Sequence, residues 1–350
     1  MARASASQRL QQAWLSRGPL ACSLLPLAAA YGALVLLRKG LMRLGVLRPQ
    51  TLAVPVIVVG NLIAGGAGKT PAVMAVVAML LRRGRRPGIV SRGHGRSGDA
   101  VLEVLPNTPA ARSGDEPRLL RMRAGVPVVV GRDRVEAARA LLRVHPDVDV
   151  IVSDDGLQHR RLPRSAQVLV FDERGAGNGW LLPAGPLREP MPAQVSPGTL
   201  VLYNAAAPST ALPGHLARRS LPGLVPLREW WNGAPPSMQA LRALVGKPVV
   251  ACAGIAHPAR FFDMLSGHGL STSALPLPDH HDFAEVPWPP GTSDVIVTEK
   301  DAVKLDTGRI GATRVWVAPL DFETGDAFEA ELLRLLPPAS TRKPDGYPIA

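Results

Sequence analysis

The sequence predicts an α/β protein: a domain built on a parallel sheet, a second, smaller α/β domain, and an N-terminal apolar helix. Three observations indicate this. Short, continuous apolar segments alternate with helical segments or Pro/Gly turns, which is typical of a sheet buried on both faces. A glycine-rich loop joins the first of these segments to a helical pattern. A long uncharged stretch lies close to the N-terminus.

The larger domain is expected at residues 48–210. An apolar strand at 54–59 leads into the glycine-rich loop, and a helical pattern follows at 71–83. Strand, loop and helix in this order form the first unit of a parallel sheet. Further β-branched segments predict strands at 87–90, 126–130, 148–152, 168–171 and 200–202.

The smaller domain is expected at 247–338. A segment rich in Pro, Ala and Gly precedes it and predicts a linker at 211–246. The elements expected in this domain are strands at 248–253, 294–297 and 314–317 and a helix at 258–266. The N-terminal helical region covers 1–47, and a frayed tail is expected at 339–350.

The charge balance indicates an anionic partner. The 350 residues include 40 Lys and Arg against 28 Asp and Glu, a formal net charge of +12. This charge favours nucleic acid, a membrane surface or a phosphorylated ligand. A hydrophobic content of 46% excludes intrinsic disorder, and an aromatic content of 4% leaves few rings for stacking on single-stranded nucleic acid. Cys22 and Cys252 show no metal-ligand spacing, so they indicate a reducing compartment.

The segment GNLIAGGAGKTP, at 60–71, has the chemistry of a phosphate-binding loop. Glycines let backbone N–H groups close around phosphate oxygens, a lysine reaches the β- and γ-phosphates, and a hydroxyl binds Mg²⁺. The strict pattern has a glycine where this chain has Ile63, but the flanking strand and helix support the assignment. The larger domain is therefore predicted to be P-loop NTPase-like. The expected nucleotide-binding residues of the loop are Gly65, Gly66, Ala67, Gly68, Lys69 and Thr70.

Two carboxylates follow a neighbouring apolar strand. Asp154 and Asp155 come just after the segment 148–152, where a P-loop protein holds its metal ion. Together with Thr70 they are the predicted Mg²⁺ ligands. ATP is favoured over GTP because the N-K-x-D element of guanine-specific GTPases is missing after 200–202.

Residues 19–37 carry no charge and lie between Arg17 and a basic pair. As a helix they span about 28 Å, close to the thickness of a hydrocarbon core. Three interpretations are open: an uncleaved membrane anchor, a buried helix of a soluble domain, and a cleaved signal peptide. The anchor is favoured over the signal peptide because the loop that follows needs cytoplasmic ATP. Pro26 weakens the segment as a straight span.

Several blocks together resemble one family, the tetraacyldisaccharide 4'-kinases, which are lipid A kinases of Gram-negative bacteria. A phosphate loop alone is shared by many ATPases, whereas DDGLQH, LLPAGPLREP and TEKDAVK in combination are specific. The matching blocks are GNLIAGGAGKTP (60–71), SRGHGR (91–96), GDEP (114–117), DDGLQHRRL (154–162), GNGWLLPAGPLREP (177–190), CAGIAHPARFF (252–262), PDHHDF (278–283) and TEKDAVK (298–304).

Two positions depart from the family pattern. Family loops commonly have Thr or Ser where Ile63 stands, so this chain loses a possible hydroxyl contact to the nucleotide. Tyr is usual where His94 stands, which leaves any substrate role of that position open.

The resemblance implies transfer of the ATP γ-phosphate to the 4'-hydroxyl of a tetraacylated glucosamine disaccharide 1-phosphate, at the cytoplasmic face of the inner membrane. It also implies that Asp115 is the catalytic base and that His280 assists it, with His281 the less favoured neighbour. An Asp–His pair suits this role because the imidazole orients the carboxylate and can take up the proton it abstracts. Lys69 is the third predicted catalytic residue, as a cation on the transferred phosphate.

Further polar residues near these blocks are candidates for ligand contacts. Gln158 is expected at the nucleotide. Arg suits a paired grip on phosphate oxygens. The expected sugar or phosphate contacts are His159, Arg188 and Glu189, with Arg132 and Arg134 as weaker candidates.

The predicted partners are ATP, Mg²⁺, the acylated disaccharide 1-phosphate and the inner membrane surface. We expect no nucleic acid and no obligate protein partner. The alternative is a membrane-targeting or partitioning ATPase of the deviant P-loop class. That class carries an additional lysine early in the loop, and here Lys69 is the only loop lysine.

Overall fold

The computed structural model describes residues 6–45 and 50–338, so the tail expected at 339–350 lies outside the described residues. The chain divides into two units, and it passes between them four times along the sequence. The domains expected from the sequence were contiguous, and the observed units are not. The first unit comprises Met1–Ser91, Asp133–Arg218 and Glu323–Ala350, and the second comprises Arg92–Arg132 and Arg219–Phe322.

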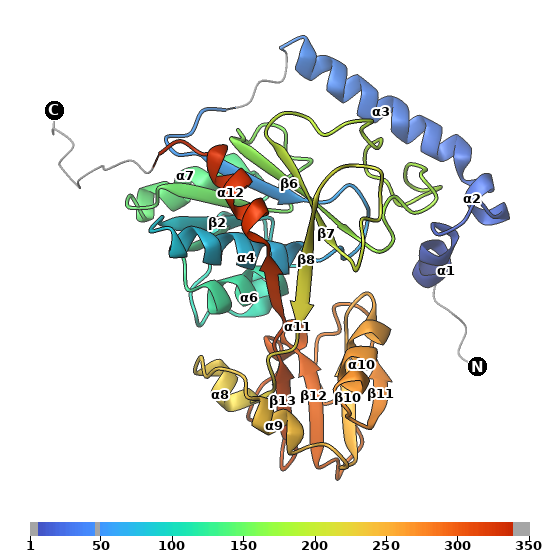
Figure 1. Ribbon diagram of the computed structural model, residues 1–350, viewed down its shortest axis with the longest axis vertical. Helices are drawn as coiled ribbons and strands as arrows, with labels where there is room; N and C mark the ends of the chain where they lie inside the picture. Colours follow the sequence, from blue (N-terminus) through green and yellow to red (C-terminus); the bar gives the residue numbers. More distant parts are fainter. Residues whose placement is uncertain (1–5, 46–49, 339–350) are drawn as a thin grey trace. The chain divides into compact units, whose positions relative to one another are not determined.

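A parallel sheet forms the centre of the first unit (Figure 1). Its strands lie in the order β8-β7-β6-β1-β5-β2, and all these neighbours pair in parallel. β1, β2 and β5 are buried along their whole length, as their continuous apolar sequences predict. The bounds are β1 (Val56–Gly60), β2 (Pro87–Ser91), β5 (Val150–Asp154), β6 (Ala166–Asp172), β7 (Thr199–Asn204) and β8 (His215–Ser220).

Helices α4 (Lys69–Arg82) and α7 (Arg134–Val144) pack on this sheet. On α4 the buried residues recur at helical spacing, so one face of the helix lies against β1, β2 and β5. An ion pair of 2.6 Å between Arg82 Nη2 and Glu329 Oε1 joins α4 to α12 (Asp326–Arg334). β14 (Asp321–Thr324) precedes α12, where the chain returns to the first unit.

The uncharged segment 19–37 forms two helices instead of one. α2 (Pro19–Ser23) ends just before α3 (Leu25–Arg43) begins, and α1 (Ala6–Ala13) precedes both. Pro26 explains the break, because it lacks the N–H that a continuing helix needs and is favoured in the first turn of a new one. In the described part of the chain, α3 is the one helix long and apolar enough to cross a membrane.

One side of α3 lies against the first unit, and the other side is exposed. Ala28 and Gly32 are buried, and a Cβ added to Gly32 would come within 3.0 Å of Leu181 Cδ1. The exposed side carries leucines, so α3 is not the fully buried core helix that was one of the three interpretations. These leucines are Leu25, Leu27, Leu34, Leu36 and Leu37.

A five-stranded sheet forms the centre of the second unit, in the order β11-β10-β12-β13-β9. Its pairs are parallel except that of β13 with the short edge strand β9. α10 (Pro258–Gly267) connects β10 to β11 and packs on both strands (Figure 1). The strand bounds are β9 (Val225–Pro226), β10 (Val249–Ala253), β11 (Thr272–Pro276), β12 (Asp294–Thr298) and β13 (Arg314–Ala318).

The second unit also contains the segment Arg92–Arg132, which forms short helices and strands. β3 (Leu102–Glu103) pairs antiparallel with β4 (Val128–Val130), and the helices between them are α5 (Ala110–Ser113) and α6 (Asp115–Ala124). Leu119 of α6 is buried in the same core cluster as Val303, which follows α11 (Glu299–Ala302). This core fixes the start of α6 against the segment 298–304.

The predicted fold class is confirmed, and each of the nine expected strands overlaps an observed one. The segment 211–246 is more ordered than the expected linker. It contains β8 and β9 and the helices α8 (Leu227–Trp231) and α9 (Met238–Arg242). Buried Leu227 and Trp230 hold α8 on the core of the second unit.

Candidate active site

The phosphate loop connects β1 to α4 in the first unit. Gly65 and Gly68 have φ values of 90° and 85°, a backbone conformation that favours glycine. Gly68 precedes the first helical residue, so Lys69 and Thr70 occupy the first turn of α4. The N-terminal end of a helix attracts anions, because its first N–H groups have no partner within the helix.

Three side chains, one from the loop itself and two from other segments, bind the carbonyl oxygens of this loop. Asn61 Nδ2 donates to Gly65 O at 3.3 Å, and Arg174 Nη2 donates to Gly66 O at 2.9 Å. Asn204, at the end of β7, donates from Nδ2 to Ala67 O at 3.1 Å. With its carbonyl oxygens held against the protein, the loop is suited to present N–H groups to phosphate oxygens.

Ile63 is a packing residue in this structure. Its side chain is fully buried, and its backbone forms an antiparallel bridge with Leu187. On either side, Ala64 N donates to Pro186 O and Arg188 N donates to Leu62 O, each at 2.7 Å. The side chain of Ile63, which departs from the family pattern, therefore packs the loop against the segment that carries Arg188.

Lys69 and Arg188 meet at one carboxylate. Lys69 Nζ lies 3.6 Å from Asp155 Oδ1 and donates to Asn61 Oδ1 at 3.3 Å, while Arg188 Nη1 lies 3.2 Å from the same Asp155 oxygen. Burial tends to raise the pKa of Asp155, but the charges of Lys69 and Arg188 outweigh it and hold this pKa below the usual value. Asp155 is therefore ionised and holds both cations beside the loop.

Asp154 ends β5 beside Val59, the residue before the loop begins. Its side chain is buried, and its Oδ2 accepts a hydrogen bond of 3.0 Å from Ser91 Oγ. A buried carboxylate beside the loop and the hydroxyl of Thr70 are hard oxygen donors of the kind Mg²⁺ prefers. The residues present thus fit the predicted metal, and Asp154 suits it better than Asp155, whose oxygens already face two cations. Among the described residues, no group of three or more His, Cys, Asp or Glu gathers as a metal cluster.

Gln158 lies beside the phosphate loop, and its expected contact with the nucleotide stays a prediction. Its Nε2 donates to Asn61 O at 3.4 Å, and its Oε1 accepts from Arg188 Nη1 at 3.4 Å. Glu189 is buried and pairs with Arg160 and, at 3.4 Å, with Lys39 of α3. These contacts link the loop to the N-terminal helix.

His159 points to a different neighbour. Its Nε2 lies 3.3 Å from Asp133 Oδ1, at the residue that caps α7. Burial and the charge of Arg134 lower the pKa of His159, so it is neutral at physiological pH. The structure brings Arg134 to the Asp155 carbonyl at 3.2 Å, whereas Arg132 is exposed and pairs with Asp99. The predicted ligand contacts of His159 stay a prediction.

A second polar cluster lies within the second unit. Asp115 is the first residue of α6, and its Oδ2 lies 3.2 Å from His280 Nδ1. The His280 backbone has φ 62° and donates from N to Gly254 O at 3.2 Å, which fixes the ring toward Asp115. His281 turns elsewhere, since its Nδ1 accepts a hydrogen bond from Phe283 N at 3.1 Å. The structure thus brings together the two residues chosen from the sequence.

The environment of Asp115 favours its ionised form. Burial tends to raise its pKa, but the hydrogen bond from His280 and the charges of Lys304 and Lys300 outweigh burial and lower the pKa below its usual value. Lys304 Nζ lies 3.7 Å from Asp115 Oδ2. The imidazole of His94 lies beside the pair, with its centroid 5.9 Å from that of His280.

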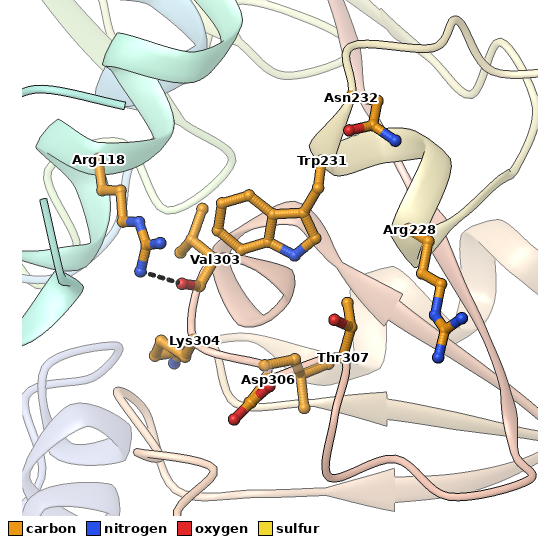
Figure 2. Close-up of a pocket in the computed structure, with 9 residues that line it drawn as sticks. Arg118, Arg228, Trp231, Asn232, Val303, Lys304, Asp306 and Thr307 are labelled. Atoms are coloured by element: carbon orange, nitrogen blue, oxygen red, sulfur yellow. Dashed lines mark hydrogen bonds between the residues drawn. The ribbon is translucent and has the colours of Figure 1, made fainter. Parts of the chain in front are cut away.

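A cavity of about 520 Å³ lies next to this cluster in the second unit. Figure 2 shows Arg118 beside Trp231 among the residues that line it, with the guanidinium carbon 4.7 Å from the ring centroid. Arg118 Nη1 also donates to Val303 O at 2.9 Å. Lys304, on the cavity wall, connects this cavity with Asp115.

Several residues of these clusters were not predicted from the sequence. Arg174 follows β6 and binds the phosphate loop, which is distant from it in the sequence. The sequence indicated this contact only by placing Arg174 just after a strand that pairs with β1. Lys300 and Lys304 lie in the block TEKDAVK, which was recognised as a motif without a role. Their side chains face His280 and Asp115, respectively.

Comparison with known proteins identifies the family. A sequence profile described as tetraacyldisaccharide-1-P 4'-kinase (LpxK) matches residues 20–337. The chain belongs to this family. A tetraacyldisaccharide 4'-kinase of Methylibium petroleiphilum is 58% identical over 346 residues, covering 97% of each chain. One of Leptothrix cholodnii is 56% identical over 341 residues, covering 96% of this chain and 97% of the relative.

A solved structure of the same family shares the fold. The crystal structure of LpxK from Aquifex aeolicus in complex with ATP superposes with a TM-score of 0.75 at 27% identity, covering 91% of this chain and 99% of that chain. This chain therefore shares its fold with a relative whose crystal structure contains ATP. The residues that match the family profile include most of both units, and Asp115 and His280 are among them.

Proposed function

We propose that this chain transfers the γ-phosphate of ATP to the 4'-hydroxyl of a tetraacylated glucosamine disaccharide 1-phosphate, in lipid A biosynthesis. The observation that carries the proposal is the Asp115–His280 pair at 3.2 Å in a chain whose phosphate loop ends in Gly68, Lys69 and Thr70. A hydroxyl acceptor needs a base, and this pair supplies one. The printed descriptions of the family and of its relatives name the same acceptor class.

In this proposal the first unit binds the nucleotide. The loop amides and Lys69 hold the β- and γ-phosphates, and Arg188 is kept close by Asp155. Thr70 and Asp154 would hold Mg²⁺, which when bound neutralises charge on the phosphates. Gln158 positions Asn61 and Arg188 for these contacts.

Asp115 acts as the base on the acceptor hydroxyl. Its lowered pKa keeps the carboxylate ionised at neutral pH, and its position at the N-terminus of α6 stabilises that charge. The proton of the 4'-hydroxyl passes to a carboxylate oxygen of Asp115 as the hydroxyl oxygen bonds to the γ-phosphorus. The bond from this phosphorus to the β,γ-bridging oxygen breaks, and ADP leaves. His280 holds the carboxylate in place through Oδ2.

We further propose that α3 attaches the protein to the inner membrane by lying in the bilayer surface on the cytoplasmic side. Tyr31 Oη donates to Arg188 O at 2.8 Å, and Arg38 Nη2 donates to Gln158 O at 3.0 Å. A helix crossing the bilayer would lose these contacts, whereas a helix at the surface keeps them and buries its exposed leucines in lipid. The acyl chains of the acceptor then stay in the bilayer, avoiding about 0.8 kcal/mol for each CH₂ exposed to water.

The test is whether ATP consumption depends on the acceptor. Purified protein in detergent is given ATP and Mg²⁺, and ADP is measured with and without acylated glucosamine disaccharide 1-phosphate. The kinase releases ADP only with the acceptor, one for each lipid phosphorylated. ADP release that needs vesicles but no sugar acceptor would indicate the membrane-targeting ATPase, which the comparisons do not favour.

A further inference from the structure

Two lysines of the segment 298–304 flank the Asp115–His280 pair. Lys300 Nζ lies 3.4 Å from His280 Nε2, on the side of the ring away from Asp115. Lys304 Nζ lies 3.7 Å from Asp115 Oδ2, the oxygen that also faces His280 Nδ1. Each member of the pair therefore has its own ammonium group.

The local fold fixes both lysines. Thr298 caps α11, with its Oγ1 accepting from Asp301 N at 3.2 Å. Asp301 is fully buried and accepts from Gly254 N at 3.1 Å, which ties α11 to the residue whose carbonyl oxygen accepts from His280 N. Asp301 Oδ1 also lies 3.3 Å from Lys304 Nζ. Lys300 and Lys304 are four residues apart, so they project from the same side of this turn.

Lys300 is held as a cation. Besides His280, its Nζ faces Asp279 Oδ1 at 3.4 Å and Glu116 Oε1 at 3.5 Å. Burial tends to lower the pKa of Lys300, but Glu116, Asp279 and Asp115 outweigh burial and raise this pKa above its usual value. The group therefore carries its full set of protons at neutral pH.

An ammonium group can only donate hydrogen bonds. The ring nitrogen that faces it must then be the acceptor, so His280 Nε2 carries no proton. The remaining nitrogen of a neutral imidazole carries the proton, and Nδ1 faces the carboxylate of Asp115. We propose that Lys300 is a positioning residue that holds His280 as the neutral Nδ1–H tautomer, which donates its hydrogen bond to the catalytic base Asp115. This inference rests on the proposed role of Asp115 as the base.

The inference defines what His280 does in the reaction. A ring with its proton already on Nδ1 orients Asp115 and cannot accept a second proton at that nitrogen. The proton taken from the acceptor hydroxyl therefore stays on the Asp115 carboxyl during phosphoryl transfer. His280 is thus an orienting group, and the alternative in which the imidazole takes up the proton is excluded by Lys300.

Loss of Lys300 removes the ammonium group that faces His280 Nε2. The groups facing His280 are then Asp115 from α6, Asp279 from its own loop, His94 from the segment after β2, and Lys304 on the far side of Asp115. Without the ammonium group, Nε2 can carry a proton that faces the Asp279 carboxylate, whose Oδ1 lies 4.0 Å away. An imidazolium paired with Asp115 makes the carboxylate a weaker base, and the reaction slows until rising pH removes the added proton.

The direct test is the tautomer of His280 in the unmodified protein. ¹⁵N-histidine spectra of the full chain in detergent distinguish protonated from unprotonated ring nitrogens, and His280→Gln identifies the signals among the eight histidines. We expect a protonated Nδ1 and an unprotonated Nε2 at pH 7. A protonated Nε2 overturns the proposal, whether Nδ1 is protonated as well or not. This measurement does not need activity, so it is independent of the proposed function.

The kinetic test compares Lys300→Met with Lys247→Met, which removes an exposed lysine of the same unit. We expect Lys300→Met to lower kcat about tenfold at pH 6.5 and to recover as the pH rises toward 9, with KM for ATP unchanged. Lys247→Met leaves kcat and the pH profile unchanged. An equal loss of kcat at every pH would mean that Lys300 has only a structural role. A lack of acceptor phosphorylation by the unmodified chain would instead contradict the proposed function.

Discussion

Asp115 is the residue on which the proposed reaction depends most. Removal of a positioned base typically lowers turnover by about 10²–10⁴-fold. We therefore expect Asp115→Ala to reduce kcat within this range while KM for ATP stays nearly unchanged, because the loop that binds ATP lies in the first unit. Initial rates at several ATP concentrations measure both constants.

Asp263→Ala is the matched control for this prediction. Asp263 is an exposed carboxylate on α10 in the same unit, so its loss tests the general effect of removing a negative charge. We expect its kcat to equal that of the unmodified protein. Near-normal turnover of Asp115→Ala would assign the base to another residue.

Arg174 is the residue that most directly supports the phosphate loop from outside it. It bonds Gly66 O, and Asp172 fixes its guanidinium through Nε at 3.0 Å. Arg174→Ala removes this support and a nearby positive charge. We expect KM for ATP to rise by about tenfold with a smaller change in kcat, as a loss of about 1.4 kcal/mol in nucleotide binding. Arg218→Ala, at an exposed arginine on β8, should leave KM unchanged.

Among single residues, the sequence predicted the functional ones that belong to a local sequence pattern. Lys69 and Asp154 follow from the spacing of a loop and a neighbouring strand, and the structure places Lys69 at the start of α4 and Asp154 at the end of β5, which pairs with β1. Arg174 and Asn204 could not be predicted in this way. Each acts on a loop carbonyl from a distant segment, and no spacing in the sequence encodes such a contact.

The element that we propose attaches the protein to the membrane is α3. Its exposed leucines are the surface that would enter the lipid, and full burial of a leucine side chain contributes about 1.5–3 kcal/mol. Leu34, Leu36 and Leu37 each expose more than half of their side chains, at 65%, 62% and 61%. We expect the triple change of these residues to Ser to weaken binding to anionic vesicles by at least about tenfold in a flotation assay.

The control for α3 is the double change Leu81→Ser and Val144→Ser. These side chains are also exposed, at 44% and 58%, but they lie on α4 and α7. They should leave vesicle binding unchanged. Equal loss of binding in both variants would mean that general surface hydrophobicity, and not α3, attaches the protein.

The sequence predicted the apolar character of this element but not its form. A lack of charge over 19–37 indicates lipid contact, whereas the break at Pro26 and the contacts of Tyr31 and Arg38 depend on tertiary packing. The helix also continues beyond the uncharged segment to Arg43. Near the end of this helix, Arg38 donates to Gln158 O and Lys39 pairs with Glu189, so its charged residues bind polar groups of the protein.

For the whole molecule, several carboxylates couple stability to pH. The pKa values of Asp115, Asp133 and Asp155 are lowered from an ordinary value of 3.8. A carboxylate with a lowered pKa contributes stability above its unfolded pKa, and this contribution is lost as the pH falls through the folded value. We therefore expect the contribution of these three carboxylates to the free energy of unfolding to be constant near pH 7. The free energy of unfolding should fall below about pH 4 as this contribution is lost.

Asp155→Asn tests this coupling. The variant leaves Lys69 and Arg188 without their shared carboxylate, so it should be less stable than the unmodified protein at pH 7. The two proteins should converge in stability as the pH falls through the lowered pKa of Asp155 in the folded state, because below it Asp155 is protonated in both states. Thermal unfolding across this pH range measures the difference, and a constant difference would contradict the electrostatic account.

The division of the molecule was the least predictable feature of the fold. The expected domains followed the chain, because composition and periodicity report only on neighbouring residues. The segment Arg92–Arg132 instead belongs with the second unit, where Leu119 joins the core around Val303. This placement brings Asp115 to His280, although 165 positions separate them in the sequence.

The most direct measurement is the position of the phosphate on the product. Purified protein is incubated with ATP labelled at the γ-phosphate, Mg²⁺ and acylated glucosamine disaccharide 1-phosphate, and the lipid is analysed by mass spectrometry and ³¹P NMR. The account predicts one added phosphate at the 4'-position, at a rate that Asp115→Ala lowers by orders of magnitude. Labelled inorganic phosphate without a labelled lipid, or a phosphate at another hydroxyl, would contradict it.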